Sequence, residues 1–338
     1  MRVELRSDTF TQPTPGMLDA MFRASVGDDV FGEDPSVNRL EEMAATLFGR
    51  QAALFSPSGT MSNQIAIKVH TRPGDEVICE TQAHVYIYEG GGIAFNSGSQ
   101  VKALPGHHGR IRASQVAAAI NPDDVHKAHT SLVCLENTSN RGGGSCYNWE
   151  DMVAIRRLCN ERGLKLHLDG ARLFNALVAT GQEAHAYGSL FHSISICLNK
   201  GLGCPIGSLL IGDADYIRQA RRVRKVFGGG MRQAGYMAAA GIYALEHQVD
   251  RLAEDHRHAR ALAQALREKP FVGEILPVET NIVIFEVLPP FTPALVVEKL
   301  RASDIFCTAI SPTQVRMVTH LDVSQAMIDK TTGCIAAL

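Results

Sequence analysis

The sequence predicts an α/β protein with a mostly parallel sheet covered by helices and a smaller α+β domain at its C-terminal end. Three observations carry this prediction. The chain has 338 residues, enough for two domains with a cleft between them. Short apolar runs alternate with longer amphipathic stretches from about residue 50 to 212. After about residue 246 this alternation gives way to a less regular pattern.

The first part of the chain contains six short, β-rich apolar runs. Each ends in a glycine or polar turn that leads into an amphipathic stretch. Short strands separated by helical patterns are typical of βαβ units, whose sheet is parallel and covered on both faces. Ligands bind at the carboxyl ends of such strands. The predicted strands are 52–55, 76–79, 131–135, 164–168, 193–197 and 208–211.

Helical patterns cover 149–162, 217–226 and a long stretch from 232 to 266. The pattern then changes to strand, strand, helix and strand without βαβ regularity, which favours a smaller α+β domain. We place the boundary at residue 246. Residues 1–246 then form a large domain with an N-terminal arm, and residues 247–338 form a small C-terminal domain. The elements expected in the small domain are strands 274–278, 281–287 and 314–319 and a helix over 294–302.

Composition and charge argue against several classes of protein. Lys and Arg total 33 and Asp and Glu total 35, so the net charge of −2 creates no global field for nucleic acid or an anionic membrane. No apolar stretch approaches the roughly 18 residues that span a bilayer. The start of the chain lacks the apolar core of a secretory signal. We therefore expect a cytoplasmic protein with a small-molecule substrate, and neither nucleic acid nor membrane as a partner.

The cysteines and the basic run at residues 218–225 are expected to have structural rather than functional roles. Eight cysteines are present but none form a CxxC pair, so we expect reduced, buried thiols and no metal site. Five cations occur within residues 218–225, without interleaved aromatic residues. A nucleic-acid site would combine cations with aromatic residues, so we expect most of this run to be a solvated helix face.

The segment Ser58-Gly59-Thr60 follows the predicted strand 52–55 and opens a helical pattern. This arrangement directs small hydroxyls, backbone N–H groups and the positive end of a helix at one point, which suits a phosphate. Taken singly, the segment is also an ordinary helix N-cap. No GxxxxGK motif follows a strand, and the glycines at 201–207 have the wrong spacing for GxGxxG.

Asp169 and Lys200 each follow an apolar strand. Asp169 comes directly after strand 164–168, where a carboxylate can pair with a cationic ring nitrogen; its alternative role is an N-cap. Lys200 ends the run from residue 193 and precedes two glycines. A lysine desolvated at a cleft becomes an imine-forming nucleophile, although a single lysine is usually a surface residue.

The three motifs together match the needs of pyridoxal 5′-phosphate (PLP). Its aldehyde requires a lysine, its ring nitrogen an acid and its phosphate a helix terminus. The acid keeps the pyridine protonated, so that the ring can accept electrons. The combination predicts PLP as the cofactor.

With these motifs in this order, the chain resembles the PLP-dependent low-specificity L-threonine aldolases, which belong to the aspartate-aminotransferase-like enzymes of fold type I. The likeness extends over nearly the whole chain. It is carried by the strings at 5–9 (LRSDT), 26–30 (VGDDV), 32–35 (GEDP), 58–60 (SGT), 168–172 (LDGAR), 197–203 (CLNKGLG), 228–233 (GGGMRQ) and 315–322 (VRMVTHLD).

The resemblance implies roles for the residues around the cofactor. Lys200 would hold PLP through an imine and Asp169 would face the pyridine nitrogen. His84 would stack on the ring, whereas by composition alone it is expected to be a packed or hydrogen-bonded histidine. The phosphate would lie among Ser58, Gly59 and Thr60, with Lys225 and Arg232 beside the phosphate of a neighbouring subunit. Arg172 would also be a cofactor-binding residue.

The resemblance also implies a substrate site. Ser7, Arg172 and Arg316 would bind the α-carboxylate, because a guanidinium fork matches a carboxylate. His126 matches a second histidine near the substrate hydroxyl, although a surface loop is the simpler interpretation of its sequence. The family's active sites lie between subunits, which implies a dimer or tetramer, with a homotetramer expected.

The implied reaction is a retro-aldol cleavage of L-threonine, L-allo-threonine and related β-hydroxy-α-amino acids to glycine and an aldehyde. Lys200, His84, His126 and Asp169 would be the catalytic residues, and the sequence does not choose between the two histidines as the base. Two departures from the family pattern, Ser139 and Phe31, bear on side-chain preference. The alternatives are a PLP-dependent β-eliminating lyase, an aminotransferase on the same fold, or a non-catalytic PLP-fold protein.

Overall fold

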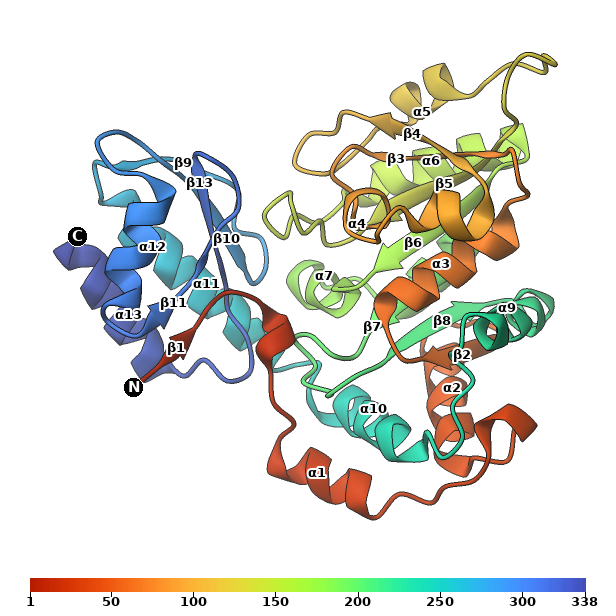
Figure 1. The fold of residues 1–338 in the computed structure, drawn as a ribbon, viewed down its shortest axis with the longest axis horizontal. Coiled ribbons are helices and arrows are strands. Elements are labelled where there is room, and N and C mark those ends of the chain that lie inside the picture. The colour runs from red at the N-terminus through yellow and green to blue at the C-terminus, as the bar shows by residue number, and fades with distance from the viewer.

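The computed structural model describes residues 1–338 and contains three sheets with helices around them (Figure 1). The largest has seven strands in the order β2-β8-β7-β6-β5-β3-β4. Only β8 runs against its neighbours, so the predicted mostly parallel sheet is confirmed. The strands are β2 (Ala52–Ser56), β3 (Glu76–Glu80), β4 (Gln100–Leu104), β5 (Thr130–Glu136), β6 (Lys165–Gly170), β7 (Ser193–Cys197) and β8 (Ser208–Gly212).

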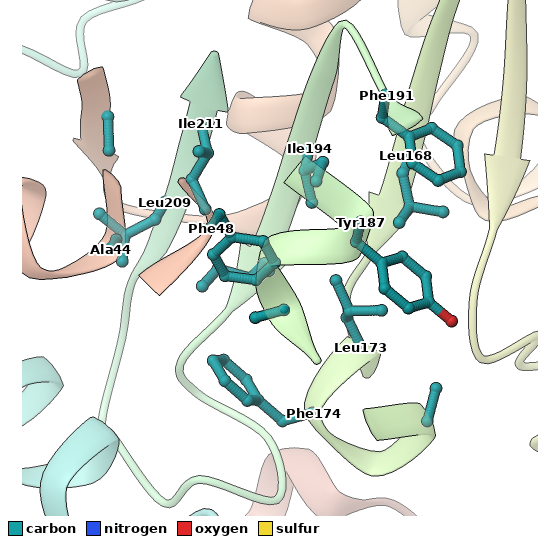
Figure 2. Close-up of a cluster of buried hydrophobic side chains, with 14 of the residues drawn as sticks. Ala44, Phe48, Leu168, Leu173, Phe174, Tyr187, Phe191, Ile194, Leu209 and Ile211 are labelled. Atoms are coloured by element: carbon teal, nitrogen blue, oxygen red, sulfur yellow. The ribbon is translucent and has the colours of Figure 1, made fainter. Parts of the chain in front are cut away.

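Helices cover both faces of this sheet, as its nearly continuous apolar strands require. Successive residues of β2 and β8 point to opposite faces. Leu54 and Leu210 pack with α3 and α9 on one face. Phe55, Leu209 and Ile211 join the largest core cluster on the other face, where Phe48 and Tyr187 also pack (Figure 2). The helices of this part are α1 (Pro15–Phe22), α2 (Pro35–Leu47), α3 (Gly59–His70), α4 (His84–Ile87), α5 (Ala113–Ala119), α6 (Trp149–Arg162), α7 (Leu173–Thr180), α8 (Ala184–Leu190), α9 (Ala214–Val226) and α10 (Gly235–His247), with short helical turns at Asp8–Phe10, Asp29–Phe31 and Ile93–Ser97.

The C-terminal part forms a separate lobe around an antiparallel four-stranded sheet in the order β12-β13-β10-β9 (Figure 1). The long helical pattern from residue 232 is two helices, α10 and α11, with a break at residues 248–251. The chain also returns to this lobe from its start: β1 pairs with β11, and Val3 and Leu5 pack in the lobe's own core. The elements are β1 (Val3–Glu4), α11 (Leu252–Arg267), β9 (Val272–Ile275), β10 (Ile282–Val287), α12 (Pro293–Arg301), β11 (Ile305–Phe306), β12 (Thr308–Ala309), β13 (Gln314–Val318) and α13 (Gln325–Ala337).

The arginine-rich helix α9 differs from the expected solvated face. Arg224 is buried, donates to Asp29 at 2.7 Å and to the Phe55 carbonyl at 2.6 Å. Arg221 donates to Glu41 at 2.6 Å. The helix lies against β2, so cations on its inner side meet one carboxylate from the turn before α2 and one from α2 itself. Two of the five cations therefore serve packing within the chain.

No helix in the structure has the length and apolar character needed to cross a bilayer.

A matched pair of glycine substitutions tests the packing of this fold. A Cβ at Gly188, in α8, would overlap the backbone carbonyl of Phe48, which cannot move without shifting α2. We expect Gly188→Ala to lower the free energy of unfolding by about 3 kcal/mol. At Gly333, in α13, an added Cβ would have no atom within 4 Å. We therefore expect Gly333→Ala to raise the free energy of unfolding by about 0.5–1 kcal/mol. Urea unfolding measures both, and equal effects would contradict the packing described.

Candidate active site

Four strands end at one edge of the large sheet, and each is followed by residues that enter the same cavity. Ser58 follows β2, His84 follows β3, Asp169 lies on β6, and Lys200 follows β7. The cavity measures about 160 Å³. It is lined by Ser58, Gly59, Thr60, Asn63, His84, Asp169, Ala171, Cys197, Asn199 and Lys200. Six residues that the sequence singled out therefore lie together.

The start of α3 forms one wall of the cavity. Ser58 caps the helix: its backbone is extended and its Oγ accepts from the Met61 N–H at 3.2 Å. A Cβ at Gly59 would overlap Cys197 Sγ, so this turn approaches β7 as closely as it does only with glycine. The unpaired N–H groups and positive dipole of a helix N-terminus are suited to a phosphate.

Asp169 is a buried carboxylate held by uncharged donors. Its Oδ2 accepts from Asn63 Nδ2 at 2.9 Å and its Oδ1 from the Ala171 N–H at 3.1 Å. A buried carboxylate is costly without a cation or several hydrogen bonds. Lys200 shares its cavity. This arrangement fits a ligand that presents a cationic ring nitrogen to Asp169 and an aldehyde to Lys200.

His84 is oriented by two carboxylates. The ring Nδ1 of His84 lies 2.9 Å from Glu89 Oε1. The backbone N–H of His84 donates to Glu136 Oε2 at 2.7 Å. Burial alone would lower the pKa of His84, but the hydrogen bond to Glu89 and the charge of Asp169 outweigh it and raise that pKa. Burial, and then the charge of Asp169, raise the pKa of Glu136 to about 7.

Asn63 and Glu89 are site residues that the sequence analysis missed. The amide of Asn63 bridges Asp169 and Glu89 at 2.9 Å each, and Gln64 Nε2 donates to Glu89 Oε2 at 2.6 Å. The position of Asn63, one helical turn after the phosphate motif, was a usable signal because residues three or four apart share a helix face. Glu89 carries no comparable signal in the sequence.

Arg172 is paired within the chain. Its Nε and Nη2 donate to the two oxygens of Asp8 at 2.7 Å each, and both residues are buried. Burial would raise the pKa of Asp8, but the charges of Arg172 and Lys200 hold it well below its usual range. The N-terminal arm is thereby tied to the cavity, since Thr11 also donates to the Lys200 carbonyl at 3.0 Å. The remaining amino group of Arg172, Nη1, forms no hydrogen bond within the chain.

Arg316 reaches toward this region from β13. Its Nη1 donates to Asn140 Oδ1 at 2.9 Å and its Nη2 to the Arg6 carbonyl at 3.1 Å, while its Nε is buried without a partner. No carboxylate pairs with this guanidinium, and burial lowers its pKa. Ser7 lies on the same arm as Asp8, where its Oγ accepts from the Thr9 N–H at 3.2 Å. A half-buried arginine with no acidic partner is suited to a carboxylate ligand.

Three predicted site residues are not brought to the cavity of the same chain. His126 precedes β5 and lies at the opposite edge of the sheet, about 20 Å of strand away from Glu136. Its side chain is 85% exposed and pairs with Asp124. Lys225 and Arg232 are also exposed, and Arg232 pairs with Asp28 at 2.9 Å. His126 therefore lies apart from the cavity of its own chain, and its place near the substrate hydroxyl stays a prediction from the resemblance.

Comparison with known proteins places this site in a family. A family model described as "Beta-eliminating lyase" matches residues 4–288. The low specificity L-threonine aldolase of Escherichia coli (strain K12) is 45% identical over 96% of both chains. A probable low-specificity L-threonine aldolase 2 of Arabidopsis thaliana is 39% identical over 98% of this chain and 96% of its own.

The chain belongs to the low-specificity L-threonine aldolase family. Solved structures agree on the fold. A Leishmania major threonine aldolase superimposes with a TM-score of 0.86 at 22% identity, covering 99% of both chains. A putative L-allo-threonine aldolase from Listeria monocytogenes gives 0.82 at 20% identity, covering 99% of this chain and 96% of that one. The predicted fold type I of PLP-dependent enzymes is confirmed.

The two departures from the aldolase family pattern lie outside the cavity. Ser139 is buried, accepts from the Gly142 N–H at 3.1 Å and packs against Gly109. A bulkier side chain there would need the loop at Gly109 to move. Phe31 is 74% exposed, in the short turn Asp29–Phe31. Neither side chain lines the cavity of its own chain.

The buried pair of Asp8 and Arg172 gives a prediction on stability. Asp8→Ala leaves Arg172 buried without its partner and is expected to lower the free energy of unfolding by about 3–5 kcal/mol at pH 7. Because the pKa of Asp8 is lower in the folded chain, its contribution is present above about pH 4 and is lost as pH falls below it. The free energy of unfolding of the variant should therefore change less than that of the wild type between about pH 4 and pH 2.

Asp19→Ala is the matched control, because the exposed Asp19 pairs only with the exposed Arg23. Urea unfolding at several pH values measures both variants. We expect the control to keep the wild-type midpoint. An Asp8 variant as stable as the wild type at pH 7 would contradict the role of the pair.

Proposed function

We propose that this aldolase-family chain binds PLP and cleaves L-threonine, L-allo-threonine and related β-hydroxy-α-amino acids to glycine and an aldehyde. The observation that carries the proposal is the cavity shared by Lys200, Asp169 and the start of α3. These groups are a nucleophilic amine, a buried carboxylate and an anion-binding helix end. The relatives named as L-threonine aldolases support the choice of substrate.

Bound PLP supplies an electrophilic aldehyde and a ring that accepts electrons. In this chain Lys200 would hold the aldehyde, and Asp169 would accept a hydrogen bond from the ring nitrogen and keep it protonated. His84 would lie over the ring, oriented by Glu89. The phosphate would be bound by Ser58, Gly59 and Thr60.

The arginines would orient the substrate. Arg316 has no acidic partner and Arg172 has one free amino group, so together they are suited to the α-carboxylate, with Ser7 beside them. A carboxylate held in this way would fix the orientation of the substrate's Cα in the cavity. Orientation of that kind accounts for a large part of an enzyme's rate advantage. The β-hydroxyl proton would pass to His84, directly or through a water.

We also propose that the active sites lie between subunits of a dimer or a homotetramer. His126, Lys225 and Arg232 are exposed in one chain and would meet the site of a neighbour. Within each chain, the division into residues 1–246 and 247–338 is proposed for the large and small domains, with the arm's first strand attached to the small one. The cytoplasmic location stays a prediction from the sequence.

A β-eliminating lyase is the second candidate, because the matching family model carries that description. Products separate the candidates. With PLP and L-threonine we expect glycine and acetaldehyde in equal amounts. A 2-keto acid with ammonia would instead indicate elimination, and a 2-keto acid without ammonia would indicate transamination. Lys200→Ala is expected to abolish product, whereas Lys299→Ala, on the outer helix α12, is expected to keep wild-type turnover.

Arg316 gives a prediction on substrate binding. Arg316→Met removes the cation that would bind the carboxylate, and kcat/KM for L-threonine is expected to fall about 100-fold. Arg316→Lys keeps the charge without the fork and should fall between the wild type and the Met variant. The exposed Arg301→Met serves as the control. Steady-state kinetics decide, and an Arg316→Met variant with wild-type kcat/KM would exclude this residue from the substrate site.

A further inference from the structure

Asn63 uses every hydrogen-bonding position of its side chain. Its Nδ2 donates to Asp169 and Glu89 at 2.9 Å each. Its Oδ1 accepts from Ser195 Oγ at 2.6 Å and lies 3.2 Å from His167 Nε2. Asn63 is buried, and a reversed amide would place its oxygen against two carboxylates. The orientation of this amide is therefore fixed.

The fixed amide determines the protons of the groups behind it. Because Asn63 Oδ1 can only accept, His167 must carry its proton on Nε2, and its Nδ1 then accepts from Ser193 Oγ at 2.9 Å. Ser193 Oγ in turn accepts from His70 Nε2 at 2.8 Å. Each donor in this series is directed toward Asp169. Burial lowers the pKa of His167 to about 4, so the ring stays neutral and this tautomer persists near pH 7.

The strand register explains how the series is built. His167 pairs with Ser193 and Asp169 pairs with Ser195 on the adjacent strands β6 and β7. Residues two apart on a strand point to the same face. These four side chains therefore form one block on the face covered by α3, and α3 supplies Asn63 to the middle of it.

The geometry points to Asn63 and His167 as positioning residues, which form a directed chain of hydrogen-bond donors that holds the carboxylate of Asp169 aimed into the cavity. The inference rests on the proposed function, in which Asp169 meets the ring nitrogen of PLP. Neither residue touches the reacting bonds. Asn63 also holds Glu89, which orients His84, so one amide couples the groups expected at the nitrogen and at the face of the ring.

Substitutions at both positions separate positioning from folding. Asn63→Leu keeps the branched shape of the side chain and removes both donors. His167→Gln keeps a donor near the Nε2 position, whereas His167→Met removes it. His256→Met is the control, because His256 is a buried, hydrogen-bonded histidine on α11 outside this chain of donors. The readouts are the dissociation constant for PLP and the pH midpoint of the bound cofactor's absorbance change, with kcat and KM for L-threonine.

Asn63→Leu and His167→Met are expected to raise the PLP dissociation constant roughly 10- to 100-fold, because hydrogen bonds to a charged group are lost or misdirected. They should lower kcat more than they change KM. The pH midpoint should rise by about one unit, because a ring nitrogen that has lost part of its positive charge repels a second proton on the cofactor less. His167→Gln should keep the PLP dissociation constant, kcat and the pH midpoint close to those of the wild type. His256→Met should lower the melting temperature and leave these three quantities unchanged.

Wild-type PLP affinity and pH midpoint in both Asn63→Leu and His167→Met would overturn the inference. An equal loss in His167→Gln and His167→Met would also overturn it, because the donor would then not matter. Should Asn63→Leu fail to fold, the His167 pair decides alone. A wild-type protein that bound no PLP, or bound it without cleaving L-threonine, would instead overturn the proposed function.

Discussion

The carboxylate of Asp169 is the constraint on which the rest of the site depends. It is buried at the end of a central strand, and its hydrogen bonds come from an amide and a backbone N–H. A charge in that place is tolerable only with fixed donors and cations nearby. Asn63, Lys200 and His84 meet that need from three other segments of the chain. The same requirement suits the cavity to the ligand proposed here, which presents a cationic ring nitrogen to Asp169.

Chain topology brings these groups together. The residues after β2, β3, β6 and β7 are separated by many positions in the sequence, but the strands end at one edge of the sheet. The N-terminal arm connects the smaller lobe to the large sheet. Asp8 on this arm accepts hydrogen bonds from Arg172, which follows β6 of the large sheet, and from Asn281, which precedes β10 of the smaller lobe. Because β13, which carries Arg316, pairs with β10, the buried ion pair of Asp8 and Arg172 helps to fix the position of Arg316 relative to the cavity. The carboxylate site proposed for the substrate thus depends on contacts between the two lobes.

Much of this architecture follows from local sequence patterns. The six predicted strands of the large sheet match the structure to within one or two residues, because each is a buried apolar run bounded by turn residues. The edge strand β4 was missed because Gln100 and Lys102 alternate with apolar residues on a half-exposed strand. The phosphate motif, Asp169 and Lys200 were found because each lies at or just past the end of an apolar run, where side chains enter the ligand-binding edge of the sheet.

Other features depend on contacts between distant segments, which no local pattern records. Arg224 looked like part of a solvated run but meets Asp29 under α9. The resemblance assigns His126 to the site, but this residue precedes β5 and lies far from the cavity of its own chain, which the sequence alone does not reveal. Asn63, Glu89 and His167 acquire their roles only when α3, β6 and the turn after α4 come together. Such networks are visible in three dimensions and not in the spacing of residues.

If Asp169 holds the ring nitrogen of PLP in its protonated form, the nitrogen itself reports its protonation state. The measurement is the ¹⁵N chemical shift of the pyridine nitrogen in wild-type protein loaded with ring-¹⁵N PLP near pH 7. We expect the shift of a pyridinium, unchanged between pH 6 and pH 8. The shift of a free pyridine nitrogen over that range, with the cofactor bound at Lys200, would contradict it.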